Sequence, residues 1–162
     1  MQISVRRAKT EDAEQICQVH IASVRELCKS NYTPEQIEAW VGKLKPEGHR
    51  QAIENPNKIM FIAEIERRIA GFSELFETEV NAVYVHPNYS RQGVGKLLLN
   101  IIEQEAIAQH IERLTLSAST NAKLFYQACG YQVIEYSFHT LRSGTKIPCI
   151  LMEKNLIQDS TF

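Results

Sequence analysis

The spacing of apolar positions changes several times along the chain, and it predicts the order of the structural elements. Residues 2–7 alternate as in a strand, and apolar residues at helical spacing then predict a helix over Thr10–Cys28. Thr33-Pro34 opens a second predicted helix, which carries Trp40 and is broken at Lys45–Gly48. Strand periodicity follows over residues 59–66, 69–77 and 79–86.

The second half of the chain returns to a helical period directly after Gly93. Apolar residues from Val94 to Ile102 follow the i, i+3, i+4, i+7, i+8 series of a helix packed on a sheet. A short strand (residues 113–117), a helix (121–129) closed by Gly130 and two strands (131–140 and 146–154) complete the pattern. The element order β-α-α-β-β-β-α-β-α-β-β predicts an α/β domain with a mixed sheet of about six to seven strands and about four helices.

Size and charge narrow the class of protein. The 162 residues, 44% of them hydrophobic, suit one compact domain, expected over residues 1–157 with a flexible tail at 158–162. The net charge of -1 provides no overall attraction for nucleic acid or an anionic membrane, and basic and aromatic residues are not interleaved. No signal peptide or membrane-spanning run is apparent, so we expect a soluble, cytoplasmic protein.

The cysteines are scattered along the chain and form no C-x-x-C pair. They are Cys17, Cys28, Cys129 and Cys149, and none of the five histidines shows metal-ligand spacing with them. We therefore expect buried, reduced thiols and no metal.

The segment from Val83 to Lys96 carries the chemical signal. A strand ends, the chain turns through Gly93 and Gly95, and a long amphipathic helix begins. The first N–H groups of a helix lack partners and carry partial positive charge, and glycines remove the side chains that would keep a phosphate away from them. Arg91 and Lys96 add positive charge, so the turn is typical of a phosphate site.

Two familiar phosphate loops are excluded by spacing. A Walker loop requires Gly in place of Ser90 and Ser or Thr in place of Leu97. A dinucleotide fingerprint that starts at Gly93 requires a third glycine, where Leu98 stands.

The segment resembles the acetyl-CoA loop of the GNAT superfamily of N-acetyltransferases, Gln/Arg-x-x-Gly-x-Gly/Ala after an apolar-aromatic-Val-x-Pro phrase. Val83–Pro87 supplies the phrase and Ser90–Gly95 supplies the loop, with Ser90 at the position of Gln or Arg and Arg91 beside it. The segment Asn121–Tyr131 is similar to the family's downstream phrase, Asn…Phe/Tyr-Tyr…Gly-Phe/Tyr. Residues 32–40 resemble a phrase of one bacterial subgroup whose acceptors are unassigned.

The resemblance implies acetyl-CoA as co-substrate and direct attack by an amine, with no acyl-enzyme. Backbone groups where two strands separate are then expected to bind the pantetheine arm and thioester. Asn121 either contacts the pantetheine amides or caps its helix. The residues expected to hold the cofactor are Val83, Tyr84, Val85, Ser90, Arg91, Gln92, Gly93, Val94, Gly95, Lys96 and Asn121.

The resemblance indicates which residue acts as the general acid more clearly than which residue acts as the general base. Tyr126 matches a tyrosine that donates a proton to the leaving thiolate, although packing between helix and sheet also explains it. Glu77 is the first choice for the base, with Glu74 and Glu79 as alternatives, and a solvated hairpin edge or direct loss of the proton to water remains open. Strand alternation places Glu77 and Glu79 on one face and Glu74 on the other.

The acceptor pocket is expected between the first two helices and the last hairpin. Tyr32 and Trp40 are candidates for its aromatic wall, although a helix-spaced Trp is more often core. His139 and Arg142 lie at the hairpin, where Arg142 either binds an acceptor carboxylate or is simply solvated. The resemblance favours an enzyme that acetylates a primary amine of a small molecule or protein, with a homodimer as an option. The alternative is a non-catalytic acyl-CoA sensor or interaction module of the same fold.

Overall fold

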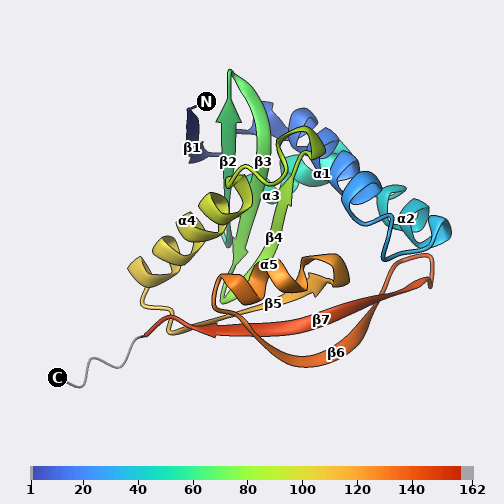
Figure 1. Cartoon of the computed structure of the whole chain (residues 1–162). Helices are drawn as coiled ribbons and strands as arrows, with labels where there is room; N and C mark the ends of the chain where they lie inside the picture. The colour runs from blue at the N-terminus through green and yellow to red at the C-terminus, as the bar shows by residue number, and fades with distance from the viewer. Residues whose placement is uncertain (1, 158–162) are drawn as a thin grey trace.

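The computed structural model describes residues 2–157, and these form a seven-stranded mixed sheet flanked by five α-helices (Figure 1). The strands are β1 (Ile3–Arg7), β2 (Lys58–Ile65), β3 (Arg68–Phe76), β4 (Glu79–Val85), β5 (Arg113–Ser119), β6 (Gln132–Thr140) and β7 (Lys146–Asn155). The helices are α1 (Ala13–Leu27), α2 (Pro34–Val41), α3 (Pro46–Glu54), α4 (Val94–Ala108) and α5 (Lys123–Ala128). The strand order is β1-β2-β3-β4-β5-β7-β6.

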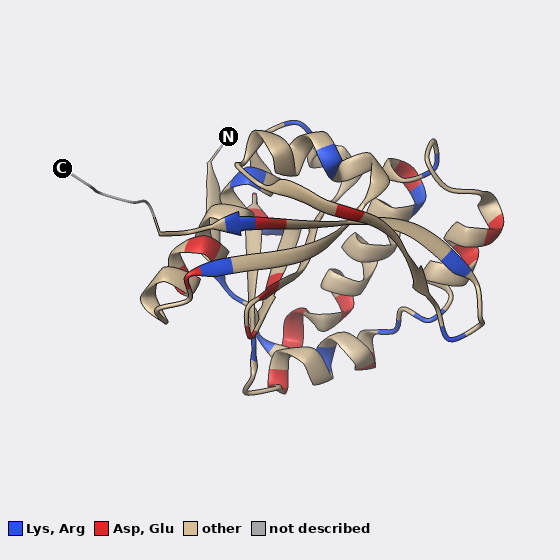
Figure 2. Cartoon of the chain, turned by 90° about the horizontal axis from the view of Figure 1, so that it is seen from below, with Lys and Arg blue, Asp and Glu red and all other residues tan. Residues whose placement is uncertain are grey.

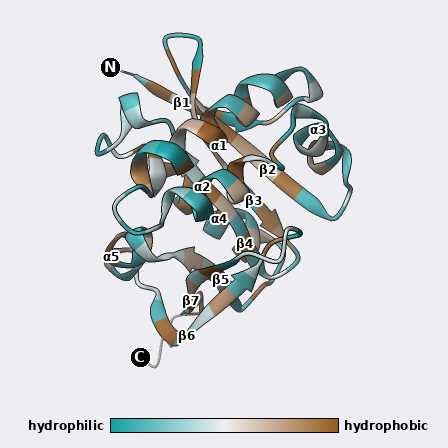
Figure 3. Cartoon of the chain, turned by 90° about the vertical axis from the view of Figure 1, so that its right-hand side faces the viewer, coloured by the Kyte–Doolittle hydropathy of each residue, from teal (hydrophilic) through white to brown (hydrophobic). Residues whose placement is uncertain are grey.

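Alternation along the central strands supplies both faces of the sheet with apolar side chains. In β2, Phe61 and Ala63 belong to the core beneath α4, whereas Met60 and Ile62 belong to the core beneath α1 and α3. Figure 3 shows the corresponding hydrophobic colouring along the inner strands and the hydrophilic colouring on the outer helix surfaces. Helices on both faces therefore fix the position of β4, where the site is built.

A third core joins α1 and α2 to the β6–β7 hairpin. Trp40 on α2 packs in one cluster with Leu141 and Ile147 of the hairpin and Val24 of α1. These contacts hold the hairpin tip over the same end of the sheet as the two helices. The arrangement encloses the space in front of β4.

The sheet separates into two parts between β4 and β5. This pair is parallel, and its register holds only Glu79 opposite Thr115 and Val80 opposite Leu116. Figure 1 shows β5 and β7 running across the direction of β2, β3 and β4. Beyond Val80, the β5 side of β4 therefore has no strand partner within the described sheet.

The sequence predicted this α/β class and element order, but it missed one helix. Pro46–Glu54 forms α3, where the sequence analysis placed only a break. Pro46 occupies the start of the helix, where its missing N–H costs nothing. The periodicity was hard to see because the helix is short and polar, and its one buried residue is His49.

Acidic and basic residues are scattered over several elements. Figure 2 shows both kinds in the view from below. None of the helices between residues 2 and 157 is long and apolar enough to cross a bilayer. The predicted tail at 158–162 lies outside the described residues.

Candidate functional site

The turn before α4 has the backbone shape that phosphate binding requires. Gly93 precedes the helix in the left-handed region with φ of 85°, and Arg91 has φ of 60°. The Ser90 hydroxyl donates to the carbonyl of Pro87 at 3.0 Å, and the Asn88 amide donates to Nδ1 of His86 at 3.1 Å. Both hydrogen bonds stabilise the loop, and the Ser90 hydroxyl is engaged in one of them.

The start of α4 presents unpartnered amides to an open cavity. The first helical bond runs from the Leu97 amide to the Gly93 carbonyl, so the amides just before Leu97 have no carbonyl one turn earlier. A Cβ added at Gly93 would meet no atom within 4 Å. The adjoining cavity of about 450 Å³ is lined mainly by the loop, β4 and α5: Leu27, Val85, Tyr89, Ser90, Arg91, Gly93, Val94, Gly95, Lys96, Phe125, Ala128 and Cys129.

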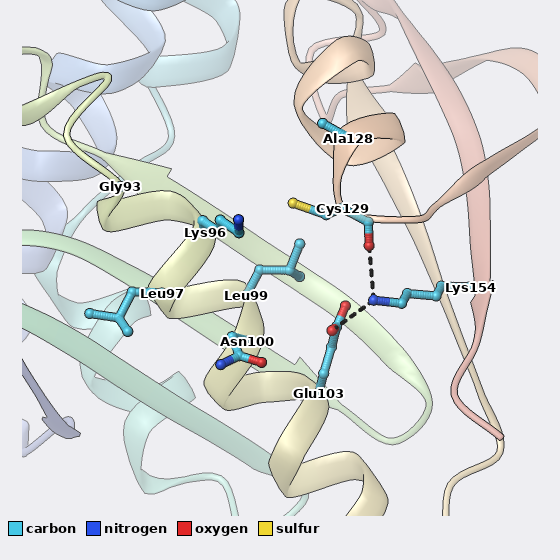
Figure 4. A pocket seen from close by; sticks show the side chains of 9 residues that line it. All are labelled: Gly93, Lys96, Leu97, Leu99, Asn100, Glu103, Ala128, Cys129 and Lys154. Atoms are coloured by element: carbon cyan, nitrogen blue, oxygen red, sulfur yellow. Dashed lines mark hydrogen bonds and ion pairs between the residues drawn. The ribbon is translucent and has the colours of Figure 1, made fainter. Parts of the chain in front are cut away.

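A second hollow continues this cavity between α4 and α5 (Figure 4). It measures about 510 Å³ and shares Gly93, Lys96 and Cys129 with the first. Lys154 forms part of its wall and donates to Glu103 at 2.9 Å and to the Cys129 carbonyl at 2.8 Å. The two hollows together form an elongated groove that begins at the amides of α4.

The open edge of β4 lies next to this groove. The His86 amide donates to the Ala70 carbonyl of β3, so alternation turns the peptide groups of Tyr84 toward β3 as well. The peptide groups of Val83 and Val85 are thereby turned to the β5 side, where the strands have separated. Of the predicted strand residues, Val83 and Val85 offer backbone hydrogen bonds to a ligand, and Tyr84 offers its side chain.

Two adjoining cavities of about 400 and 240 Å³ border β4 around the Tyr84 side chain, and the smaller one also reaches Ser117 and Ser119 of β5. The residues that line both are Trp40, Lys43, Asn81, Tyr84 and His139. The larger cavity also contains His20, His49 and Glu74, and the smaller contains Tyr32 and Glu79. Helices α1 and α2 and the last hairpin, where the acceptor pocket is expected, supply much of this wall.

The three candidate carboxylates separate in a way that the sequence analysis did not predict. Asn81 is an extra residue in β4, because the register pairs Glu74 with Ala82 and Leu75 with Val80. Glu79 pairs with Phe76 across the turn, and Phe76 shares a face of β3 with Glu74. Glu74 and Glu79 therefore both line the cavities, and the predicted placement of Glu74 on the opposite face is wrong. Glu77 is exposed in the β3–β4 turn with φ of 55° and lines neither cavity.

Glu74 is buried and already engaged. It is only 4% exposed, accepts a hydrogen bond from the Asn81 amide and lies 3.8 Å from Nζ of Lys58. Its side chain is therefore held in place by two neighbouring residues at the wall of the cavity.

Tyr32 and Trp40 both line the smaller cavity, and each also has a structural role. The Tyr32 hydroxyl donates to the Pro148 carbonyl at 2.7 Å and accepts from the Thr120 amide at 2.9 Å. Burial raises the pKa of this phenol, so it stays protonated. Its ring packs edge to face against Trp40, with 5.6 Å between centroids.

Tyr126 lies on α5 with its ring buried between Phe125 and Tyr131. Burial, and to a smaller extent Cys129, raises the pKa of the Tyr126 phenol, which is therefore protonated at neutral pH. Tyr126 in turn contributes to raising the pKa of Tyr84, after burial as the main cause. The phenol has the protonation state that an acid requires.

Asn121 does not cap α5. The cap position is Ala122, and Asn121 lies exposed in a 3-10 turn, Thr120–Ala122, just before it. The capping interpretation is therefore wrong, and the proposed contact with pantetheine remains.

A histidine pair in the larger cavity was missed by the sequence analysis. Nδ1 of His20 on α1 lies 3.1 Å from Nε2 of His49 on α3. The only sequence signal was a histidine within the apolar series of α1, and nothing in the sequence connected it with a helix that was itself missed. All four cysteines are free, as predicted, and residues 2–157 contain no cluster of three potential metal ligands.

Comparison with known proteins identifies the family. The sequence model of the acetyltransferase (GNAT) domain matches residues 28–156, and the chain therefore belongs to this family of N-acetyltransferases. The chain is 28% identical over 134 residues to the uncharacterized N-acetyltransferase YafP of Escherichia coli, covering 82% of this chain and 83% of the relative.

Solved structures share the fold over nearly the whole chain. A GCN5-related N-acetyltransferase from Rhodopseudomonas palustris aligns with a TM-score of 0.89 and 28% identity, covering 96% of each chain. The PaiA N-acetyltransferase from Thermoplasma acidophilum, solved with coenzyme A, aligns with a TM-score of 0.79 and 24% identity over 96% of this chain and 99% of that one. The predicted GNAT fold is confirmed.

Proposed function

We propose that the protein transfers the acetyl group of acetyl-CoA to a primary amine by direct attack. One observation carries the proposal: the amides before Leu97 and the open edge of β4 adjoin one groove, and the cavities proposed for the acceptor border the same strand around Tyr84. Two reactants can thus reach the same strand from two cavities. Holding both in place avoids the entropic cost of their encounter.

The residues of the groove fit the parts of acetyl-CoA. The amides around Gly93 to Lys96, with the charges of Arg91 and Lys96, suit the diphosphate. The backbone of Val83 and Val85 suits the amides of the pantetheine arm, and Asn121 lies exposed where the arm would pass α5. When bound, acetyl-CoA supplies an activated acyl group.

Tyr126 supplies the acid in this proposal. Its phenol is protonated and lies on α5, the helix beside the separated strands. A phenol placed near the sulfur donates a proton to the thiolate as it leaves. A backbone N–H of Val83 or Val85 stabilises negative charge on the thioester oxygen, a contribution of about 3 kcal/mol in comparable sites.

The acceptor cavities suit a cationic or polar amine. Glu74 and Glu79 supply carboxylates, and Trp40 and Tyr84 supply aromatic faces. Glu77 is not used, because it lies outside these cavities.

An amine panel tests the function. Purified protein, acetyl-CoA and a thiol reagent are combined with a polyamine, an aminoglycoside, free lysine and a peptide with a free N-terminus. Thiol release above the rate without amine is the expected result for at least one class. Tight acetyl-CoA binding without release across a broad panel would favour the acyl-CoA sensor instead.

A further inference from the structure

The proton positions in the His20–His49 pair follow from one backbone carbonyl. Nδ1 of His49 lies 3.0 Å from the carbonyl oxygen of Lys45, and a carbonyl can only accept, so this nitrogen carries the hydrogen. In neutral His49, Nε2 is then an acceptor. Nδ1 of His20, 3.1 Å away, must therefore donate to it.

In this tautomer Nε2 of His20 carries no hydrogen, and its lone pair is free to accept a hydrogen bond. The atom is buried, and it has no hydrogen-bond partner among residues 2–157. Burial, helped by His49, lowers the pKa of His20 to about 3, so the ring is neutral and its lone pair available. A buried acceptor without a partner is destabilising, and it is the kind of atom that a ligand N–H would satisfy.

The histidine pair lies beside the strand where transfer would occur. The His20 ring packs on the Tyr84 ring, with 4.1 Å between centroids, and also contacts Phe72 of β3. Tyr84 stands between Val83 and Val85, whose backbone faces the thioester in the proposed function. His20 and His49 both line the larger acceptor cavity.

Other ionisable groups around that cavity are committed elsewhere or lie on its rim. Glu74 is held by Asn81 and Lys58. Tyr84 stays protonated because burial raises its pKa. Lys43, Lys45 and His139 also line the cavity, and all three are exposed. Among these groups, His20 is the one with a ring nitrogen that can accept a hydrogen bond and has no hydrogen-bond partner among residues 2–157.

We propose that Nε2 of His20 accepts the proton of the acceptor amine, with His49 as the positioning residue that holds the ring in this tautomer. The inference rests on the proposed function. The amine nitrogen forms a bond to the acetyl carbon while its proton passes to Nε2, and the C–S bond breaks as the sulfur takes a proton from Tyr126. The products are the amide and coenzyme A thiol. His20 then returns its proton to solvent, and Tyr126 takes a proton back from solvent, so both residues regain their starting states.

The first test reads the tautomers directly. Long-range ¹H–¹⁵N spectra of histidine-labelled, full-length protein at pH 7 are expected to show both His20 and His49 protonated at Nδ1 only. His20→Gln and His49→Gln assign the signals. A proton on Nε2 of His20, or an imidazolium at this pH, would overturn the proposal whether or not an acceptor has been found.

The second test measures rates with the panel amine that the wild type acetylates. His20→Gln is expected to lower kcat about 100-fold with little change in the acetyl-CoA thermal shift, since general bases contribute at least this much. His49→Gln should lower kcat less and leave KM for the amine unchanged. The control His110→Asn removes an exposed histidine in the turn after α4, where Asn tolerates the positive φ of 62°.

The outcomes separate this proposal from the proposed function. A wild type that consumes no acetyl-CoA with any amine overturns both. An active wild type with His20→Gln within twofold of its kcat overturns only the role of His20. If His20→Gln lowers kcat but also loses folded structure, the His49→Gln variant decides. The proposal then requires His49→Gln to lower kcat with KM for the amine unchanged, and an unchanged kcat in that variant would overturn the role of His20.

Discussion

Gly93 and Gly95 are two residues apart in the cofactor loop, yet the structure requires them for different reasons. Gly93 has a positive φ and open space around its missing Cβ, so it clears the approach to the helix amides. A Cβ at Gly95 would lie 3.3 Å from the Phe125 ring, so this glycine lets α4 and α5 pack closely. The sequence motif indicated that both glycines belong to the loop, but it could not distinguish their structural roles.

The open space at Gly93 gives the first prediction. Gly93→Glu places a carboxylate where the diphosphate is proposed to bind, so acetyl-CoA should no longer raise the melting temperature. Gly144→Glu is the matched control, because Gly144 also has a positive φ, of 86°, and no atom within 4 Å, but lies in the β6–β7 turn. An unchanged thermal shift in Gly93→Glu would remove the proposed site.

The Tyr126 hydroxyl gives the second prediction. Tyr126→Phe keeps the packing against Phe125 and Tyr131 but removes the proton donor, so kcat should fall about 100-fold with little change in acetyl-CoA affinity. Steady-state kinetics and a binding titration measure the two quantities. If kcat holds while the melting temperature drops, Tyr126 serves packing alone.

At the scale of elements, the sequence predicted the long helix after Gly93 and the strands well, because their periodicity is sustained. It could not predict the bulge at Asn81, which depends on the register between β3 and β4. Nor could it predict that the β3–β4 turn pairs Glu79 with Phe76, which places Glu79 on the same face of the sheet as Glu74. The short, polar α3 was missed, and with it the partner of His20.

Tyr32 connects three elements and gives the third prediction. Tyr32→Phe leaves the Thr120 amide and the Pro148 carbonyl without their partner, which should cost about 1–3 kcal/mol of unfolding free energy. Tyr136→Phe is the control, because that hydroxyl is exposed and bonds only to Lys123 among the described residues, so the change should stay within about 0.5 kcal/mol. Urea denaturation compares them, and equal losses would contradict the structural role of Tyr32.

At the scale of the whole molecule, the class and element order followed from periodicity, whereas the strand order and the separation of β4 from β5 did not. Both depend on contacts between distant segments, such as Glu79 with Thr115. The same is true of the two cavities proposed to bind the acceptor, to whose walls α1, α2, α3 and the last hairpin contribute. The single-domain boundary at 157 and the option of a homodimer stay predictions.

The neutral His20 ring, whose Nε2 atom is buried, makes global stability depend on pH. Its pKa is lowered to about 3 in the folded protein, whereas an unfolded histidine titrates near 6.5, so the unfolded chain binds more protons between these values. As pH falls below about 6.5, the wild type should lose stability relative to His20→Gln by up to about 1.4 kcal/mol per pH unit. Urea denaturation between pH 4 and 8 measures both curves, and parallel curves would show that His20 charges in the folded state.

The claim on which the account depends is that the backbone amides at the start of α4 bind the diphosphate of acetyl-CoA. A crystal structure of the protein with acetyl-CoA at millimolar concentration tests it most directly. The account predicts diphosphate oxygens within hydrogen-bond distance of amides between Gln92 and Lys96, with the thioester beside Val83 and Val85. A diphosphate bound elsewhere, or no bound acetyl-CoA at that concentration, would contradict it.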